Sequence, residues 1–257
     1  MVKQRVLITG ASGLIGQLLL RGLEDEYDVS CIDARRSPSR SIRRANMTRL
    51  RVVERSFEGA DLVIDLAAQA AADTPWRDVY RNNVPATFNA LEASRRAGVR
   101  RVLYASSNHV TGLYELDDPY AAIVAGRYGG LDASKIPYVT ARHPVRPDGP
   151  YALGKVFGEA AGRYYAEQFG ISVICLRIGT VNESGVPRKP RDFATLLTHG
   201  DLVRLVESCL RAPDDLRYGI FYGVSANTWR FWDIEDAEAA VGYVPEDNAE
   251  NWRSAGT

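Results

Sequence analysis

The fold is decided by a stretch near the N-terminus, Arg5-Val6-Leu7-Ile8-Thr9-Gly10-Ala11-Ser12-Gly13-Leu14-Ile15-Gly16. An aliphatic run of strand type leads directly into a turn with a glycine at every third position, and a helical pattern follows. Gly10 permits a tight turn, Gly13 lets the backbone approach a pyrophosphate, and Gly16 lets the helix pack on the strand. The start of that helix then faces the anion. The stretch predicts a strand–turn–helix unit that binds a dinucleotide through Gly10, Ser12, Gly13, Leu14, Ile15 and Gly16.

Further strand and helix patterns alternate along the chain. Short β-branched or aliphatic runs occur at 29–33, 62–66, 101–106 and 173–177, and helical patterns occur at 13–24, 78–97 and 151–169. Strands that are buried on both faces and joined by helical crossovers produce this alternation. The sequence therefore predicts an α/β fold with a Rossmann-type doubly wound parallel sheet.

Two later regions depart from that alternation. Residues 111–150 are rich in Gly, Pro, Asp and Tyr, so we expect an inserted loop region there, and loops of this length are usually functional. We expect residues 1–178 to form the cofactor-binding domain. Residues 179–257, with a helix at about 200–211 and a strand at 220–224, are expected to form a small C-terminal substrate-binding lobe that packs on it. The aromatic cluster of Trp229, Phe231 and Trp232 is expected to serve core packing or a subunit contact.

Composition points to a small-molecule partner. The chain has 32 basic and 32 acidic residues, which favours neither a nucleic-acid-binding surface nor an acidic, salt-adapted one. Its three cysteines lie in apolar runs without metal-ligand spacing, as expected for reduced core thiols. The first strand follows the N-terminus without the pattern of a signal peptide, and no apolar run is long enough to span a bilayer. We expect a cytoplasmic protein that contacts no membrane.

A carboxylate at position 33 sets the expected choice of dinucleotide. Asp33 ends the second strand at a spacing that suits hydrogen bonds from the adenosine ribose hydroxyls. Because a carboxylate there repels a 2′-phosphate, NAD is favoured over NADP as the cofactor. Arg35 and Arg36 follow at once and are able to attract that phosphate, so NADP stays open.

Tyr151 and Lys155 begin the helical pattern at 151–169. Their separation by four residues puts the phenol and the ammonium on one helix face, one turn apart. A neighbouring cation and the positive end of a helix both stabilise a phenolate, which suits a general base that takes a proton from a hydroxyl. The strand at 101–106 leads into Ser107, at the edge where open α/β sheets bind ligands. We predict a catalytic group of Ser107, Tyr151 and Lys155.

These motifs together resemble the extended branch of the short-chain dehydrogenase/reductases, over most of the chain. The glycine turn and the trio of Ser107, Tyr151 and Lys155 match the motifs of that branch. Leu66-Ala67-Ala68 match its strand-end segment beside the cofactor, and Asn83 matches its helix asparagine. The resemblance implies an NAD-dependent enzyme whose cofactor contacts also include Leu66, Ala67, Ala68, Asn83, Tyr151, Lys155 and Ile178.

Four segments look most like those of the uronate dehydrogenases within that branch: 106–109, 146–151, 177–180 and 225–227. The resemblance implies oxidation of C1 of a hexuronate to its lactone by NAD, with Tyr151 as general base. It makes Arg191 the residue that grips the carboxylate, and a guanidinium fork suits a planar carboxylate. Arg191 fits a solvated basic loop equally well. The expected substrate-binding residues are Ser107, Asn108, His109, Thr180 and Arg191.

Three departures from the family pattern bear on specificity. The acidic segment that caps adenine is hard to find near Arg55-Ser56, and Asp65 replaces the family's histidine in the fourth strand. About 44 residues separate Ser107 from Tyr151, and much of this segment is absent from typical uronate dehydrogenases. An insertion beside the pocket is able to change the substrate.

Alternative functions stay open at this point. A hexose 6-phosphate or another sugar is an alternative substrate, since Lys189 and Arg191 are able to hold phosphate. A nucleotide-sugar epimerase is a second alternative, whereas Asn108 and His109 stand where dehydratases carry an acidic pair. A redox-sensing module would need no proton-transfer group. His143 and His199 have no partner at metal-ligand spacing, so we expect no metal, and the helices near 78–97 and 151–169 suggest a homodimer by analogy with the family.

Overall fold

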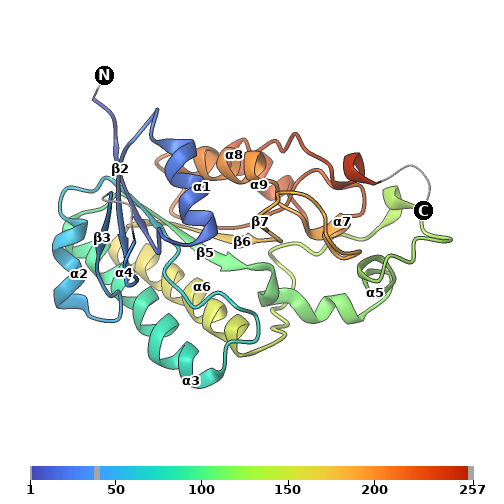
Figure 1. Ribbon diagram of the computed structural model, residues 1–257, viewed down its shortest axis with the longest axis horizontal. Coiled ribbons are helices and arrows are strands. Elements are labelled where there is room, and N and C mark those ends of the chain that lie inside the picture. The colour runs from blue at the N-terminus through green and yellow to red at the C-terminus, as the bar shows by residue number, and fades with distance from the viewer. Residues whose placement is uncertain (1, 38–40, 254–257) are drawn as a thin grey trace.

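The described part of the chain, residues 2–37 and 41–253 of a computed structural model, contains one seven-stranded sheet (Figure 1). The strands follow the order β3-β2-β1-β4-β5-β6-β7, and all neighbouring strands are parallel. They are β1 (Arg5–Thr9), β2 (Asp28–Asp33), β3 (Ile42–Arg44), β4 (Leu62–Asp65), β5 (Arg101–Ser107), β6 (Ser172–Ile178) and β7 (Tyr218–Gly223). The predicted doubly wound Rossmann-type fold is confirmed.

Helices cover both faces of this sheet (Figure 1). One face carries α1 (Leu14–Leu23) and α8 (His199–Leu210), and the other carries α2 (Leu50–Phe57), α4 (Val84–Ala97) and α6 (Pro150–Phe169). The other helical segments are α3 (Trp76–Asp78), the π-helical η1 (Val79–Asn83), the 3-10 segments η2 (Asn108–Leu116), η3 (Ala133–Lys135) and η4 (Ala249–Trp252), and α5 (Tyr120–Val124), α7 (Asp192–Thr195) and α9 (Glu235–Val241).

Burial on both faces explains why the central strands are readable from sequence. Successive side chains of a strand point to opposite faces. Val6 and Ile8 of β1 therefore join the core beneath α1 and α8, whereas Leu7 joins the core beneath α2, α4 and α6. Both sets must be apolar, so the strand appears as a continuous aliphatic run. The three cysteines also lie in these cores, buried and free, as predicted.

The edge of the sheet contains two elements that the sequence patterns did not predict. Strand β3 has three residues, of which Arg43 and Arg44 are exposed, so it carries no apolar run. Helix α2 follows it and buries only Val53 and Phe57. An edge strand needs only one protected face, which leaves little signal in the sequence.

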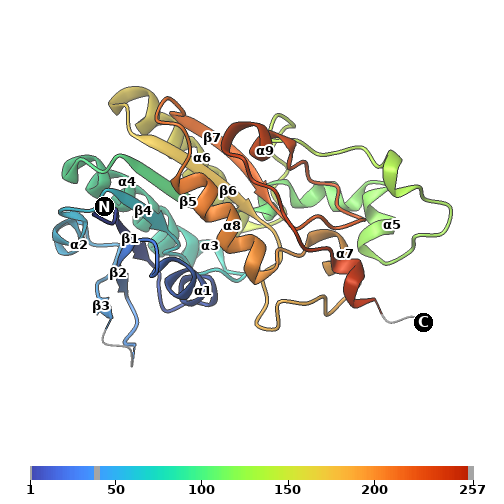
Figure 2. The same ribbon diagram turned by 90° about the horizontal axis from the view of Figure 1, so that it is seen from above.

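The C-terminal part of the chain does not form a lobe wholly apart from the sheet. The strand expected there, at 220–224, is β7, which pairs in parallel with β6, and α8 packs beside α1. The sheet therefore continues beyond residue 178. Helix α7 and the segment 222–234 pack against the inserted region, which contains α5 and η3, and form a third core with it that includes Phe231 and Trp232, whereas α9 belongs to the core beneath α1 and α8. Figure 2 shows α5 and α7 at the end of the molecule opposite β3.

This third core accounts for the aromatic cluster and for the insertion. Phe231 and Trp232 are fully buried, and Trp229 stacks on Tyr128 with ring centroids 4.3 Å apart. Val139 forms a β-bridge with Trp232. The cluster thus serves core packing, and the insertion is an ordered layer rather than an unstructured loop. Within residues 2–37 and 41–253, no helix has the length and apolar character needed to cross a membrane.

Candidate active site

A cavity of about 850 Å³ opens along the carboxyl ends of the strands. It extends from the β1–α1 turn past the ends of β2, β4, β5 and β6 to residues 189–191. The strand order reverses between β1 and β4, and ligands of open α/β sheets bind at such a switch point. Most of the predicted cofactor and substrate residues line this cavity: Gly10, Gly13, Leu14, Ile15, Gly16, Asp33, Leu66, Ala67, Ala68, Asn83, Ser107, Asn108, His109, Tyr151, Lys155, Ile178, Thr180 and Arg191.

The glycine turn has the geometry of a dinucleotide cradle. Gly10 adopts φ +65°, and a Cβ atom there would lie 2.7 Å from the backbone oxygen of Leu66. A Cβ at Gly16 would lie 2.6 Å from the Cα of Ala11, so the helix packs directly on the turn. Ser12 is the exception among the predicted residues. It does not line the cavity, and its backbone N–H donates to Asp33 Oδ2 at 2.9 Å.

The carboxylate of Asp33 lies at the wall of the cavity and is almost fully buried. Its Oδ1 accepts from the backbone N–H of Arg35 at 2.8 Å and from Arg35 Nε at 3.4 Å. These contacts hold Asp33 in place and put Arg35 at the same wall. Both features that the sequence weighed, the carboxylate and the arginine, are therefore present at the expected ribose site.

The segment that follows β3 lies nearer the N-terminus than the sequence predicts. Residues 55–56 lie within α2, whereas Asn46, Met47 and Thr48 line the cavity after β3. Asn46 Oδ1 accepts from the backbone and the hydroxyl of Thr48 at 3.0 and 2.9 Å. This segment could not be located from the sequence, because β3, the strand before it, is only three residues long and contains two exposed arginines.

Asn83 shapes the cavity wall through the backbone of the loop that follows β4. Its Oδ1 accepts from the N–H of Gln69 at 2.8 Å, and its Nδ2 donates to the carbonyl of Gln69 at 3.1 Å. Asn83 ends the π-helical turn η1. The pair of hydrogen bonds fixes the strand-end segment 66–69 against α4, with Leu66, Ala67 and Ala68 facing the cavity.

Tyr151 and Lys155 lie in the first turns of α6, on the side that faces the sheet. Both are at least nine-tenths buried, and both line the cavity. Lys155 Nζ donates to the carbonyl of Ala105 at 2.6 Å and lies 5.5 Å from the centroid of the Tyr151 ring. The helix starts at Pro150, so the positive end of its dipole is close to the phenol.

Two serines end β5, and their contacts distinguish them. The hydroxyl of Ser106 donates to Glu159 Oε1 at 2.6 Å, inside the protein. The hydroxyl of Ser107 donates to Asn108 Oδ1 at 3.2 Å and accepts from the backbone N–H of His109 at 3.2 Å. Both serines line the cavity, but the hydroxyl of Ser106 donates to Glu159 inside the protein, whereas that of Ser107 is bonded only to its neighbours Asn108 and His109 in the polar wall at the end of β5.

Asn108 and His109 extend this polar wall. Asn108 is buried, and its Nδ2 has no hydrogen-bond partner among the described residues. His109 Nδ1 lies 2.6 Å from Asp148 Oδ2, and its ring contacts Tyr151 edge-on at 6.2 Å between centroids. Asp148 occupies the space that a side chain at Gly112 would take, since a Cβ there would lie 2.1 Å from Asp148 Oδ2. No sequence pattern pairs Asp148 with His109, from which it is 39 residues distant.

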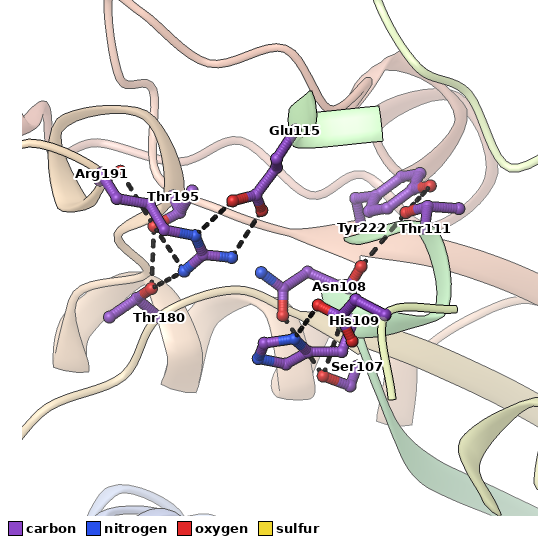
Figure 3. Close-up of polar contacts among 10 residues, drawn as sticks. Ser107, Asn108, His109, Thr111, Glu115, Thr180, Arg191, Thr195 and Tyr222 are labelled. Atoms are coloured by element: carbon purple, nitrogen blue, oxygen red, sulfur yellow. Dashed lines mark hydrogen bonds and ion pairs between the residues drawn. The ribbon is translucent and has the colours of Figure 1, made fainter. Parts of the chain in front are cut away.

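Arg191 lies at the sugar end of the expected site, but its guanidinium is already engaged. Its Nε and Nη2 donate to the two carboxylate oxygens of Glu115, each at 2.6 Å, as Figure 3 shows. Its Nη1 donates to Thr180 at 3.1 Å and to Thr195 at 3.4 Å. Arg191 is thus no solvated surface residue, and Thr180 holds it in place. Glu115, which the sequence analysis missed, comes from η2 at the start of the insertion.

Asp65 lies buried beneath this site, at the end of β4. It accepts a hydrogen bond from the hydroxyl of Thr9 at 2.6 Å and one from the N–H of Ala67 at 3.3 Å. Burial raises the pKa of Asp65 to about 6, because these hydrogen bonds and the Lys155 ammonium offset only part of the desolvation.

The other two histidines have local roles in the structure. His199 Nε2 lies 2.8 Å from the carbonyl of Asn182, and His143 Nδ1 contacts the hydroxyl and N–H of Thr140. Among the residues that the structure describes, no group of three or more His, Cys, Asp or Glu side chains is arranged to hold a metal ion.

The fold, the glycine cradle and the Tyr–Lys pair together define a dinucleotide-dependent oxidoreductase, and comparison with known proteins gives its family. The model of the NAD dependent epimerase/dehydratase family matches residues 6–199. The chain belongs to this family, an extended type of short-chain dehydrogenase/reductase, and its cofactor is NAD. The cradle at Gly10 and the carboxylate of Asp33 fit that dinucleotide.

Individual relatives match nearly the whole chain. It is 34% identical to the NAD-dependent glucose-6-phosphate dehydrogenase of Haloferax volcanii, over 96% of this chain and 94% of that protein. It is 31% identical to the L-arabinose 1-dehydrogenase (NAD(P)(+)) of the same organism, over 95% and 97%. The crystal structure of uronate dehydrogenase from Agrobacterium tumefaciens superposes with a TM-score of 0.82 at 26% identity, over 100% of this chain and 91% of that one.

Proposed function

We propose that this protein is a sugar dehydrogenase that oxidises the C1 hydroxyl of a ring-form sugar to a lactone, with Tyr151 as general base. The observation that carries the proposal is that Ser107, Tyr151 and Lys155 line one cavity with the glycine cradle. The relatives named above act, by their names, on glucose 6-phosphate, L-arabinose and uronate. The L-arabinose enzyme's name assigns its oxidation to position 1.

The roles of the three residues follow from their positions. The Tyr151 phenolate takes the proton of the C1 hydroxyl, which passes to solvent. The Lys155 ammonium, 5.5 Å from the phenol ring, stabilises the negative charge on Tyr151. The hydroxyl of Ser107 orients the reacting oxygen. Bound NAD would supply the hydride acceptor for the C1 hydrogen, so that one sugar would give one lactone, one NADH and one proton.

The sequence is compatible with two anionic groups at the end of the sugar, a carboxylate and a phosphate. Arg191 favours a hexuronate in the sequence analysis, and Lys189 with Arg191 favours a hexose 6-phosphate. The relatives do not decide, because their names include acidic, phosphorylated and neutral sugars. An anionic substrate therefore stays a prediction from the sequence.

Deuterium transfer tests the proposed reaction. Purified protein is mixed with NAD and with D-glucose, D-galactose, L-arabinose, D-glucuronate, D-galacturonate or glucose 6-phosphate, each also supplied with deuterium at C1. We expect NADH to form with one of them, a lactone to form in equal amount, and the deuterium to appear in the reduced cofactor. A nucleotide-sugar epimerase would accumulate no NADH and would instead interconvert a nucleotide sugar.

We also propose that a homodimer forms through α4 and α6. Exposed apolar side chains gather on these helices and on the turn before α4, namely Trp76, Tyr80, Phe88, Leu153, Tyr164 and Phe169. Such surfaces are typical of subunit contacts. Light scattering after size-exclusion chromatography measures the mass, and a monomer at micromolar concentration contradicts this proposal. A cytoplasmic location is a further proposal, which the free cysteines support.

A further inference from the structure

The ion pair of Arg191 and Glu115 occupies the position where the sequence predicts a grip on a substrate carboxylate. The two carboxylate oxygens of Glu115 accept hydrogen bonds from Nε and Nη2 of the Arg191 guanidinium, both at 2.6 Å. Both side chains are mostly buried, with 19% and 14% of their surfaces exposed. Their charges cancel at short range, so the cavity gains no net positive charge from Arg191.

The remaining donors of Arg191 cannot form a second fork. A guanidinium has five N–H donors, and a carboxylate in a fork needs two parallel ones. Nε and one N–H of Nη2 go to Glu115, and Nη1 goes to Thr180 and Thr195. One N–H of Nη2 is left. A substrate carboxylate would have to displace Glu115 or break the threonine contacts, and it would lie beside a like charge.

The other polar groups of the cavity suit hydrogen bonds with the hydroxyl groups of a sugar. Asn108 lines the cavity as a neutral amide, and its Nδ2 is buried without a partner among the described residues. The Ser107 hydroxyl faces the cavity, and His109, held through Nδ1 by Asp148, has its other ring nitrogen available for a further hydrogen bond. Figure 3 shows Asn108 between Ser107 and the Arg191–Glu115 pair. Lys189 lines the rim but is exposed, where water screens its charge.

We propose that Glu115 makes the site selective for an uncharged sugar, one that carries a hydroxymethyl group or hydrogen where a hexuronate carries its carboxylate. The inference rests on the proposed function and deepens it. Glu115 acts through Arg191, as a specificity-determining residue that keeps the guanidinium neutralised and oriented. The insertion after β5 thus changes the substrate by supplying one carboxylate from its first turns.

Matched pairs of sugars test this inference. D-galactose and D-galacturonate differ only at C6, as do D-glucose and D-glucuronate, and kcat/KM is measured for each with NAD. We expect the wild type to favour the neutral member of the pair it oxidises by at least about tenfold. In Glu115→Gln, which removes the charge and keeps the shape, we expect this preference to fall about tenfold, mainly through a lower KM for the uronate. Glu26→Gln, an exposed charge change after α1, should leave the preference unchanged.

The outcomes separate the two proposals. If no sugar reduces NAD, the proposed function fails and this inference fails with it. If sugars are oxidised but the wild type prefers the uronate, or prefers glucose 6-phosphate to glucose, the inference alone is overturned. A Glu115→Gln protein that folds and keeps the wild-type preference also overturns it. If that variant does not fold, the wild-type preference and the inhibition constant of the uronate against the neutral sugar decide in the same way.

Discussion

The buried ion pair between Glu159 and Arg177 gives a prediction whose size follows from the structure. Glu159 lies on the inner face of α6 and Arg177 lies in β6, with 6% and 1% of their side chains exposed. Glu159 accepts from Arg177 Nε at 2.9 Å, from Nη2 at 2.8 Å and from the hydroxyl of Ser106 at 2.6 Å. Arg177 Nη1 donates to the hydroxyl of Tyr222 at 3.0 Å. The pair therefore joins α6, β5, β6 and β7 directly beneath the active site.

Glu159→Gln removes the counter-charge and leaves a buried guanidinium. Breaking a buried pair in this way costs about 3–5 kcal/mol, and each kcal/mol lowers the Tm of a chain of this length by roughly 2–4 °C. We expect thermal unfolding, followed by circular dichroism, to shift down by roughly 6–20 °C. Glu167→Gln breaks an exposed pair on the same helix and should change stability by less than about 1 kcal/mol. A Glu159→Gln protein that unfolds within about 2 °C of the wild type would refute the reasoning.

Three further substitutions test the described contacts. Asp148→Asn removes the charged partner of His109 and should lower kcat/KM about tenfold, and an effect below about twofold would show that Asp148 does not act through the histidine. Asp33→Ser removes the carboxylate and keeps Arg35. The ratio of kcat/KM with NADP to kcat/KM with NAD should then rise at least about tenfold. An unchanged ratio contradicts the assignment of Asp33 to the adenosine ribose. The pKa of Asp65 is about 6 in the folded protein and about 3.9 in the unfolded chain, so ionisation of this carboxyl lowers the free energy of unfolding. This loss of stability is absent below about pH 4, where Asp65 is protonated in both states, and reaches about 3 kcal/mol above pH 6. Asp65→Asn should therefore be more stable than the wild type at pH 8 in urea unfolding and lose that advantage as the pH falls to 4, whereas an advantage that grows at low pH contradicts this.

The elements of the fold that could be predicted are those whose sequence pattern depends only on neighbouring residues. The apolar strand before Gly10 is buried on both faces, and the four-residue spacing of Tyr151 and Lys155 puts them on one helix face wherever the helix lies. Strand β3 was not predicted, because two of its three residues are exposed arginines and it has no apolar run. The strand at 220–224 was recognised, but its place beside β6 follows from packing that no local pattern encodes.

The site shows the same division. Residues predicted at the ends of strands or the starts of helices line one cavity, because the carboxyl ends of parallel strands meet at one edge. The carboxylates that pair with two of them were not predicted. Glu115 is 76 residues from Arg191, and Asp148 is 39 residues from His109. Such pairs form only once the insertion folds against the rest of the chain. Thus the family and its cofactor were readable from sequence, whereas the contacts on which the proposed substrate selectivity rests required the structure.

Tyr151→Phe tests the central claim most directly, because it removes one hydroxyl from the proposed base and keeps the ring that packs beside His109. The measurement is the rate of NADH formation with the sugar that the wild type oxidises, together with the Kd for NAD by calorimetry. We predict that turnover falls roughly 10²–10⁴-fold while the Kd for NAD changes by less than about threefold. Turnover within about threefold of the wild type, with NAD bound equally well, would contradict the role of Tyr151 as general base.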